Sequence, residues 1–216
     1  MTLQQRYEGI LSVFSEVMPS PATELDYDTP FHLLLAVILS AQCTDKRVNI
    51  VSPALFKAFP TPESLAAVEP EDVFPYIKSV TFPNNKSKHL VNAARKIVND
   101  FGGELPSDID KLTTIPGVGR KTANVMLAVV WGKAAMPVDT HVFRVSNRIG
   151  LTRNSKTPRE TEKTLVKHIP AAMLADAHHW LILHGRYTCK ARKPLCLECP
   201  IRAYCRTYER QPDETA

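Results

Sequence analysis

A proline and two glycines within four residues divide one helical stretch of this chain into two. Pro116, Gly117 and Gly119 interrupt the segment LTTIPGVGRKTANVML, which covers residues 112–127, and a second helical run begins at Arg120. Glycine permits positive φ and places no side chain between the backbone and a ligand. Backbone N–H groups at the start of a helix suit a phosphate oxygen. The segment therefore predicts two helices joined by a tight, anion-accepting turn.

The rest of the chain also has helical periodicity, and no stretch shows the alternation typical of a strand. Ser107, followed three residues later by Asp110, predicts the cap of the helix before the turn. Thr157 and Glu160 predict a second capping box. Residues 31–41 are apolar almost all round, which indicates a buried central helix. We therefore expect an all-α protein.

Composition and charge exclude fewer function classes than the motifs do. The 216 residues carry a formal net charge of +5, which favours a polyanionic partner without proving one. The N-terminus lacks a signal-peptide pattern, and the longest apolar run, Phe31–Leu39, is too short to cross a bilayer. Four of the five cysteines lie within seventeen residues, which favours a metal centre in a reducing compartment over a disulfide scaffold. We expect no membrane partner and a cytoplasmic location.

Three further motifs follow the hairpin. They are Pro-Val-Asp-Thr-His at 137–141, HHWLILHGRYTC at 178–189, and the cysteines Cys189, Cys196, Cys199 and Cys205. In this order they resemble the endonuclease III family of helix-hairpin-helix DNA glycosylases, and the resemblance extends from about Leu25 to Cys205.

The resemblance implies a two-lobed, all-α fold. A six-helix barrel lobe would span 22–132 and include the helix-hairpin-helix motif at 108–127. A helical lobe would join 1–21 to 133–216 and carry an iron–sulfur cluster loop at 189–205. The active site of the family lies in the cleft between such lobes.

The resemblance also implies the activity. Members of the family are base excision repair enzymes that release oxidised pyrimidines such as thymine glycol from duplex DNA. They then cleave 3′ to the abasic site by β-elimination through a lysine Schiff base. The expected partner is double-stranded DNA with a damaged pyrimidine or an abasic site, and we expect a monomer in the bacterial cytoplasm and nucleoid.

Lys121 and Asp139 are the catalytic residues that the resemblance implies. A helix N-terminus, the adjacent Arg120 and burial in a cleft would each favour the neutral, nucleophilic amine of Lys121. From the residue alone, a surface lysine that touches a phosphate is the more ordinary interpretation. Asp139 would stabilise positive charge on the sugar and assist deprotonation, and it also suits the N-cap of the next helix.

The four clustered cysteines have the spacing Cys-x6-Cys-x2-Cys-x5-Cys, which on its own would accept zinc or an iron–sulfur cluster. The resemblance implies a [4Fe-4S] cluster with Cys189, Cys196, Cys199 and Cys205 as its ligands. The cluster would order the loop that they enclose rather than take part in the chemistry.

DNA contacts are expected at four places. Gln42 matches the residue that enters the void left by the extruded base, and Phe82 stands where the family's apolar wedge is usually leucine. A core phenylalanine at a helix end is the ordinary alternative for Phe82. The remaining expected contacts are phosphate-binding positions in the hairpin and the cysteine loop: Gly117, Gly119, Arg120, Lys190, Arg192 and Lys193.

Two other functions fit parts of this pattern. A monofunctional adenine glycosylase of the same superfamily usually lacks the lysine found here as Lys121, and it carries a further C-terminal domain that we do not expect beyond Cys205. A non-catalytic DNA-binding module would need neither Lys121 nor Asp139. The histidines His141, His179 and His184 are expected to be packed, hydrogen-bonded side chains.

Overall fold

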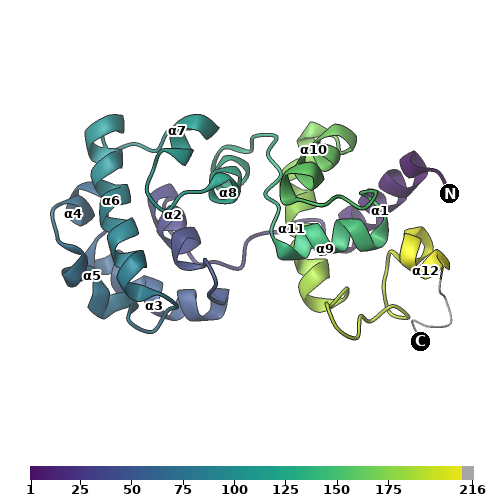
Figure 1. Cartoon of the computed structure of the whole chain (residues 1–216), viewed down its shortest axis with the longest axis horizontal. Coiled ribbons are helices and arrows are strands. Elements are labelled where there is room, and N and C mark those ends of the chain that lie inside the picture. The colour runs from purple at the N-terminus through teal and green to yellow at the C-terminus, as the bar shows by residue number, and fades with distance from the viewer. Residues whose placement is uncertain (211–216) are drawn as a thin grey trace. The chain divides into compact units, whose positions relative to one another are not determined.

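The computed structural model describes residues 1–210, and every regular element in that span is a helix. The chain divides into two compact units, whose elements are labelled in Figure 1. The inserted unit is Glu24–Trp131, and the terminal unit joins Met1–Thr23 to the described residues from Gly132 onward. The expectation of an all-α fold is confirmed for the described residues. None of their helices combines the length and apolar character needed to cross a membrane.

The inserted unit is built round one buried helix. Its elements in chain order are α2 (Pro30–Leu39), α3 (Asp45–Ala58), α4 (Pro62–Ala66), α5 (Pro70–Ile77), α6 (Pro83–Phe101), α7 (Ile109–Thr113) and α8 (Arg120–Trp131). Every residue of α2 from Phe31 to Leu39 is buried, and this helix packs against α3, α6 and α8. The prediction of a buried central helix is confirmed.

Helix α6 supports the two short helices α4 and α5, which both pack against it (Figure 1). Each short helix begins with proline, whose missing N–H is not needed in the first turn. The guanidinium of Arg95 on α6 donates to the carbonyl oxygens of Ala66 at 3.1 Å and Val68 at 2.9 Å. These bonds fasten the end of α4 to the middle of α6.

The terminal unit has its own apolar core. Its elements are α1 (Leu3–Val17), α9 (Thr140–Ile149), α10 (Pro158–His168), the 3-10 helix η1 (Ala171–Met173), α11 (Leu174–Tyr187), the 3-10 helix η2 (Arg202–Tyr204) and α12 (Arg206–Arg210). Helix α11 packs against α9, and Trp180 at its centre is buried. The indole N–H of Trp180 donates to the carbonyl oxygen of Met18 at 2.8 Å, so α1 is tied to this core.

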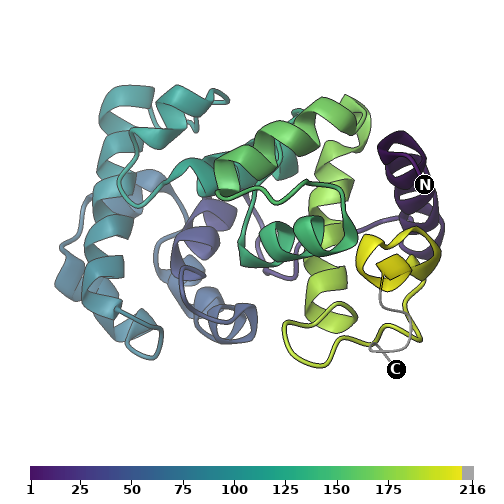
Figure 2. The ribbon, with the colours of Figure 1, turned by 45° about the vertical axis from the view of Figure 1, so that its right-hand side comes forward.

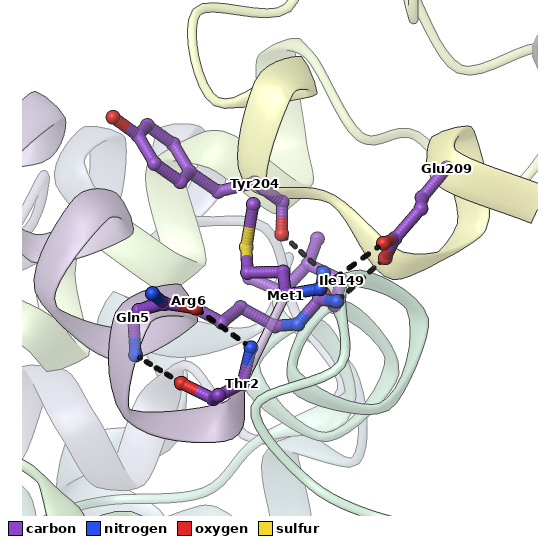
Figure 3. Close-up of polar contacts among 7 residues, drawn as sticks. All are labelled: Met1, Thr2, Gln5, Arg6, Ile149, Tyr204 and Glu209. Carbon is purple, nitrogen blue, oxygen red and sulfur yellow. Dashed lines mark hydrogen bonds and ion pairs between the residues drawn. The ribbon is translucent and has the colours of Figure 1, made fainter.

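The side chain of Arg6, which is only 5% exposed, joins α1 to the segment from Tyr204 to Glu209 within the terminal unit. Its guanidinium donates to the carbonyl oxygens of Ile149 and Tyr204 and to Glu209 Oε2, the last at 2.8 Å (Figure 3). Figure 2 shows η2 and α12, in yellow, lying beside α1. Arg6 therefore fixes the segment that follows the last cysteine.

Several local predictions need correction. Asp108, not Ser107, caps α7, and its carboxylate accepts from Lys111 N–H at 2.9 Å. Thr157 does cap α10, but the carboxylate of Glu160 accepts from Lys156 N–H instead of returning to the cap residue. The 3-10 helix η2 and helix α12 were not expected at all, because neither is long enough to show a helical period.

Candidate active site and cysteine-lined cavity

The predicted hairpin is present, with α7 and α8 on either side of a turn at residues 114–119. Gly117 has φ of +81°, and a Cβ built there would lie 3.0 Å from His89 Cβ. Gly119 does not have positive φ, and a Cβ there would meet no atom within 4 Å. Positive φ therefore explains only Gly117, whereas Gly119 leaves the surface in front of α8 open.

A buried side chain anchors the turn from below. Val118 is buried, and its N–H donates to Ile115 O at 3.0 Å. Gly119 O accepts the first bond of α8, from Ala123 N–H at 2.9 Å. These contacts fix the backbone from Val118 to Gly119, so the exposed surface of the turn has a defined conformation.

Lys121 lies in the first turn of α8 and is exposed, as is its neighbour Arg120. Burial was one of the three influences expected to favour a neutral amine, and the exposed position removes it. Lys121 stands in the first turn of a twelve-residue helix, next to the cationic side chain of Arg120.

Asp139 is the N-cap of α9 in the terminal unit. Its Oδ1 accepts from Val142 N–H at 2.8 Å, and the carboxylate is half-buried. The segment before it, Ala135–Val138, is buried, and His178 Nδ1 lies 3.0 Å from Pro137 O. The side chain of Asp139 is thus held by Val142 N–H and follows a buried backbone segment, while Lys121 belongs to the other unit.

Gln42 and Phe82 both have left-handed backbones, with φ of +55° and +54° respectively. Such values are uncommon for residues with a β-carbon. Gln42 is exposed, and Phe82 is 60% exposed, the highest value among the exposed large hydrophobic residues of the described chain. The alternative of a core phenylalanine is therefore wrong. The structure brings these two loops together, since Thr81 Oγ1 donates to Gln42 O at 2.8 Å.

The four clustered cysteines surround a cavity of about 220 Å³ in the terminal unit. Its other lining residues include Arg148, His184, Leu195 and Tyr208. Within residues 1–210, no three cysteine, histidine or carboxylate side chains converge as the ligands of a single metal ion do. Thiols spread round a cavity suit a multi-iron cluster bound at its corners.

Burial keeps the thiols of Cys189, Cys196 and Cys199 in their neutral, protonated form when no metal replaces the protons. Burial raises the pKa of the Cys199 thiol to about 11, and the neighbouring thiols add to this effect. Burial likewise raises the pKa of Cys189 and of Cys196. Thiolate ligation by iron would replace the protons on these sulfurs and offset their mutual repulsion. The residues present therefore fit an iron–sulfur cluster.

Two arginines that the sequence analysis missed hold the cysteine loop. Arg148 donates to Lys190 O at 2.6 Å and to Ala191 O at 3.2 Å, and its Nη1 lies 3.6 Å from Cys189 Sγ. Arg144, one helical turn earlier, donates to Cys189 O at 3.0 Å. Their spacing of four residues on one face of α9 was the available signal.

The basic side chains of this loop point outward in consequence. Lys190, Arg192 and Lys193 are all exposed. Lys193 has φ of +49°, and Leu195 N–H donates to Thr188 O at 3.0 Å, which closes the loop. Its backbone is held on the inner side by Arg148, so the three charges are left at the surface.

Comparison with known protein families agrees with this geometry. The model of the HhH-GPD superfamily base excision DNA repair proteins matches residues 35–171, and that of the iron–sulfur binding domain of endonuclease III matches residues 189–205. The fold, hairpin and cysteine cavity thus define a helix-hairpin-helix base excision DNA repair protein.

Individual relatives narrow this class. Endonuclease III of Rickettsia conorii is 48% identical over 92% of this chain and 94% of its own length, and that of Escherichia coli is 43% identical over 93% and 95%. A solved structure of a trapped endonuclease III–DNA covalent intermediate matches with a TM-score of 0.91 at 40% identity, covering 98% of this chain and 100% of that one. The chain belongs to the endonuclease III family.

Membership establishes the general activity and the cofactor. The protein is a base excision repair DNA glycosylase with the abasic-site lyase activity of endonuclease III. It carries a [4Fe-4S] cluster, and the cysteine-lined cavity is the place that fits it.

Proposed function

We propose that the protein releases oxidised pyrimidines from duplex DNA and cleaves the resulting abasic site, with Lys121 as nucleophile and Asp139 as its partner carboxylate. The observation that carries this proposal is the exposed amine of Lys121 in the first turn of α8, directly after the open turn at Gly119. No β-carbon stands in front of this position, so a DNA backbone has room to approach it.

The chemistry follows from the amine. Neutral Nζ of Lys121 attacks C1′ of the damaged nucleoside, the bond from C1′ to the base breaks, and the base leaves with the electron pair and a proton. Nζ then loses a proton and its electron pair forms a double bond to C1′, while the C1′–O4′ bond breaks and O4′ takes up a proton. The resulting ring-opened Schiff base makes the C2′ proton acidic. Removal of that proton expels the 3′ phosphate by β-elimination.

Asp139 has a suitable form for its role. Its Oδ1 is committed to Val142 N–H, which leaves the second carboxylate oxygen to stabilise positive charge on the sugar. The cap interaction also fixes the rotamer of the side chain, so no ordering is needed when the transition state forms.

The remaining proposed DNA contacts are of two kinds, to the phosphate backbone and to the bases. We assign backbone phosphates to Gly117, Gly119 and Arg120 at the hairpin, because exposed N–H groups at a helix start attract anions. We assign further phosphates to the exposed loop residues Lys190, Arg192 and Lys193. Gln42 and Phe82 enter the duplex when the damaged base is extruded.

We place the barrel lobe at 22–132 and the cluster lobe at 1–21 with 133–216. The compact inserted unit, Glu24–Trp131, supports this division. We further propose that the protein acts as a monomer on damaged or abasic double-stranded DNA, without a membrane partner. The bacterial origin of the relatives supports a location in the cytoplasm and nucleoid.

The decisive experiment is borohydride trapping on duplex DNA that contains one abasic site or one thymine glycol. Wild type should form a stable cross-link with both, and Lys121→Ala should form none. Lys163→Ala, at an exposed lysine of α10, is the matched control and should cross-link like wild type. A cross-link that survives in Lys121→Ala would place the nucleophile elsewhere. Tight DNA binding without any cross-link in wild type would indicate a monofunctional enzyme or a binding module.

A further inference from the structure

Lys86 is a buried lysine in the first turns of α6, and its side chain is satisfied by neutral oxygens. The residue is only 4% exposed. Its Nζ donates to Leu39 O at 2.7 Å, to Ala41 O at 2.8 Å and to Thr81 Oγ1 at 3.1 Å. An ammonium group has three protons, so these three bonds use all of them.

The acceptors explain how a buried charge is tolerated there. Leu39 is the last residue of α2, so its carbonyl belongs to the negative end of that helix. Burial nevertheless lowers the pKa of Lys86, and nearby Cys43 partly opposes that effect. Lysine is rarely buried without a reason, since its charge must be desolvated. Helix packing alone would be served as well by an apolar side chain of the same length.

A second bond extends the contact to the neighbouring loop. Thr81 Oγ1 accepts from Lys86 and donates its own proton to Gln42 O at 2.8 Å. Lys86 therefore reaches the loop after α2 twice, once directly at Ala41 and once through the hydroxyl of Thr81.

Gln42 and Phe82, two of the residues with left-handed backbones, are the immediate neighbours of the bonded ones. Gln42 follows Ala41, and Phe82 follows Thr81. A residue with a β-carbon keeps positive φ only where the surrounding structure enforces it. The bond from Lys86 to Ala41 O falls on the peptide unit that precedes Gln42, and the bond to Thr81 Oγ1 holds the side chain of the residue that precedes Phe82.

We propose that Lys86 is the positioning residue that holds the Gln42 and Phe82 side chains in register for entry into the DNA duplex. This inference rests on the proposed function of those two residues. Lys86 touches neither DNA nor the reacting atoms; it acts through the two loop backbones. Its loss should therefore slow extrusion of the damaged nucleotide and leave the chemistry of an already accessible sugar intact.

The test compares two abasic substrates under single-turnover conditions. In a duplex the abasic nucleotide must be extruded, whereas in single-stranded DNA it is already accessible. Lys86→Met keeps the length of the side chain and removes its donors. We expect at least a tenfold slower lyase rate on the duplex and a change within twofold on the single strand.

Arg95→Met is the matched control, because Arg95 also lies on α6 and also donates to backbone carbonyls. It should preserve the ratio of duplex to single-strand rates even if it lowers thermal stability by as much as Lys86→Met. Equal loss on both substrates in Lys86→Met, or the same ratio in both variants, would overturn the proposal.

Thr81 supplies a second test if Lys86→Met fails to fold. Thr81→Val removes the hydroxyl at an exposed position, and Thr81→Ser retains it. We expect the lyase rate on duplex DNA to fall about threefold in Thr81→Val, which is less than in Lys86→Met. The rate should return to that of wild type in Thr81→Ser. Equal duplex rates in Thr81→Val and Thr81→Ser would contradict a contribution from the hydrogen bonds of Thr81 Oγ1.

Two further variants separate this inference from the proposed function. Lys121→Ala that still cross-links to single-stranded abasic DNA would refute the proposed nucleophile and leave the ratio test for Lys86 valid. Gln42→Ala combined with Phe82→Ala should slow duplex cleavage, and adding Lys86→Met should then slow it little further. A Gln42 and Phe82 double variant with an unchanged duplex rate would overturn the role of Lys86.

Discussion

The carboxylate of Asp139 accepts a hydrogen bond of 2.8 Å from the backbone N–H of Val142, which makes a proposed catalytic residue also the N-cap of its helix. One side chain thus has a structural and a chemical task. The two tasks are separable, because asparagine caps a helix about as well as aspartate but carries no charge.

We expect Asp139→Asn to retain its unfolding free energy within a few tenths of a kcal/mol and to lose activity by about 10²–10⁴-fold. Asp139→Ala should lose activity similarly and also lose about 1 kcal/mol of stability. Chemical denaturation and single-turnover glycosylase rates measure the two effects. Thr157→Ala removes the cap of α10 and is the matched control, with a comparable stability loss and normal activity. Full activity in Asp139→Asn would rule out a role for the charge.

Arg148 is expected to protect the cluster. Its guanidinium lies 3.6 Å from Cys189 Sγ and donates to two carbonyls of the cysteine loop, so it opposes thiolate charge and holds the loop closed. Arg148→Met should lose the visible absorption of the cluster several-fold faster in the presence of an iron chelator. Arg148→Lys should restore only part of the resistance to the chelator, because lysine lacks the two forked nitrogens of the guanidinium. Arg159→Met on the surface of α10 is the control, and equal decay rates would contradict this role.

The exposed charges of the cysteine loop should govern the salt dependence of DNA binding. Replacing Lys190, Arg192 and Lys193 with glutamine should reduce the slope of log K against log salt by about one for each phosphate that is no longer neutralised. Binding to undamaged and damaged duplexes should weaken alike. Lys163→Gln with Lys167→Gln, both exposed on α10, should leave the slope unchanged. An unchanged slope in the loop variant would show that the loop does not touch the phosphates.

Arg6 should stabilise the terminal unit mainly through the backbone. We expect Arg6→Met to lower the unfolding free energy by about 2–3 kcal/mol, because hydrogen bonds from a charged group to Ile149 O and Tyr204 O disappear. Glu209→Gln should lower the unfolding free energy by much less, since Glu209 is exposed and solvent screens its ion pair with Arg6. Denaturant unfolding measures both. Equal losses would indicate that the ion pair, rather than the carbonyl contacts, matters.

Local features of the sequence predicted local features of the structure. The turn at Gly117, the buried α2 and the capping residues Thr157 and Asp139 each depend on a few neighbouring residues, so pattern and chemistry suffice to find them. The cysteine array was found in the same way, since its four members lie within one short segment.

The contacts that hold the candidate sites were not predictable in this way. Lys86 binds carbonyls 45 and 47 residues away, and Arg6 binds a carbonyl 198 residues away. Each acceptor is a backbone oxygen, which every residue possesses, so the sequence contains no signal for the pairing. The sequence also could not predict that Lys121 and Phe82 are exposed. Periodicity predicts a helix face but not what covers it.

The pKa of His179 makes the terminal unit sensitive to acid. Burial lowers this pKa below the ordinary value near 6.5, and Asp176 only partly opposes the effect. The unfolded chain therefore binds a proton more readily than the fold does, so stability is complete above about pH 6.5 and falls as the pH drops towards the folded pKa. His179→Gln should reduce the slope of unfolding free energy against pH in that window, by at most about 1.4 kcal/mol per pH unit. The two curves should run parallel above pH 7, which is the internal control, and equal slopes at acid pH would show that His179 does not contribute.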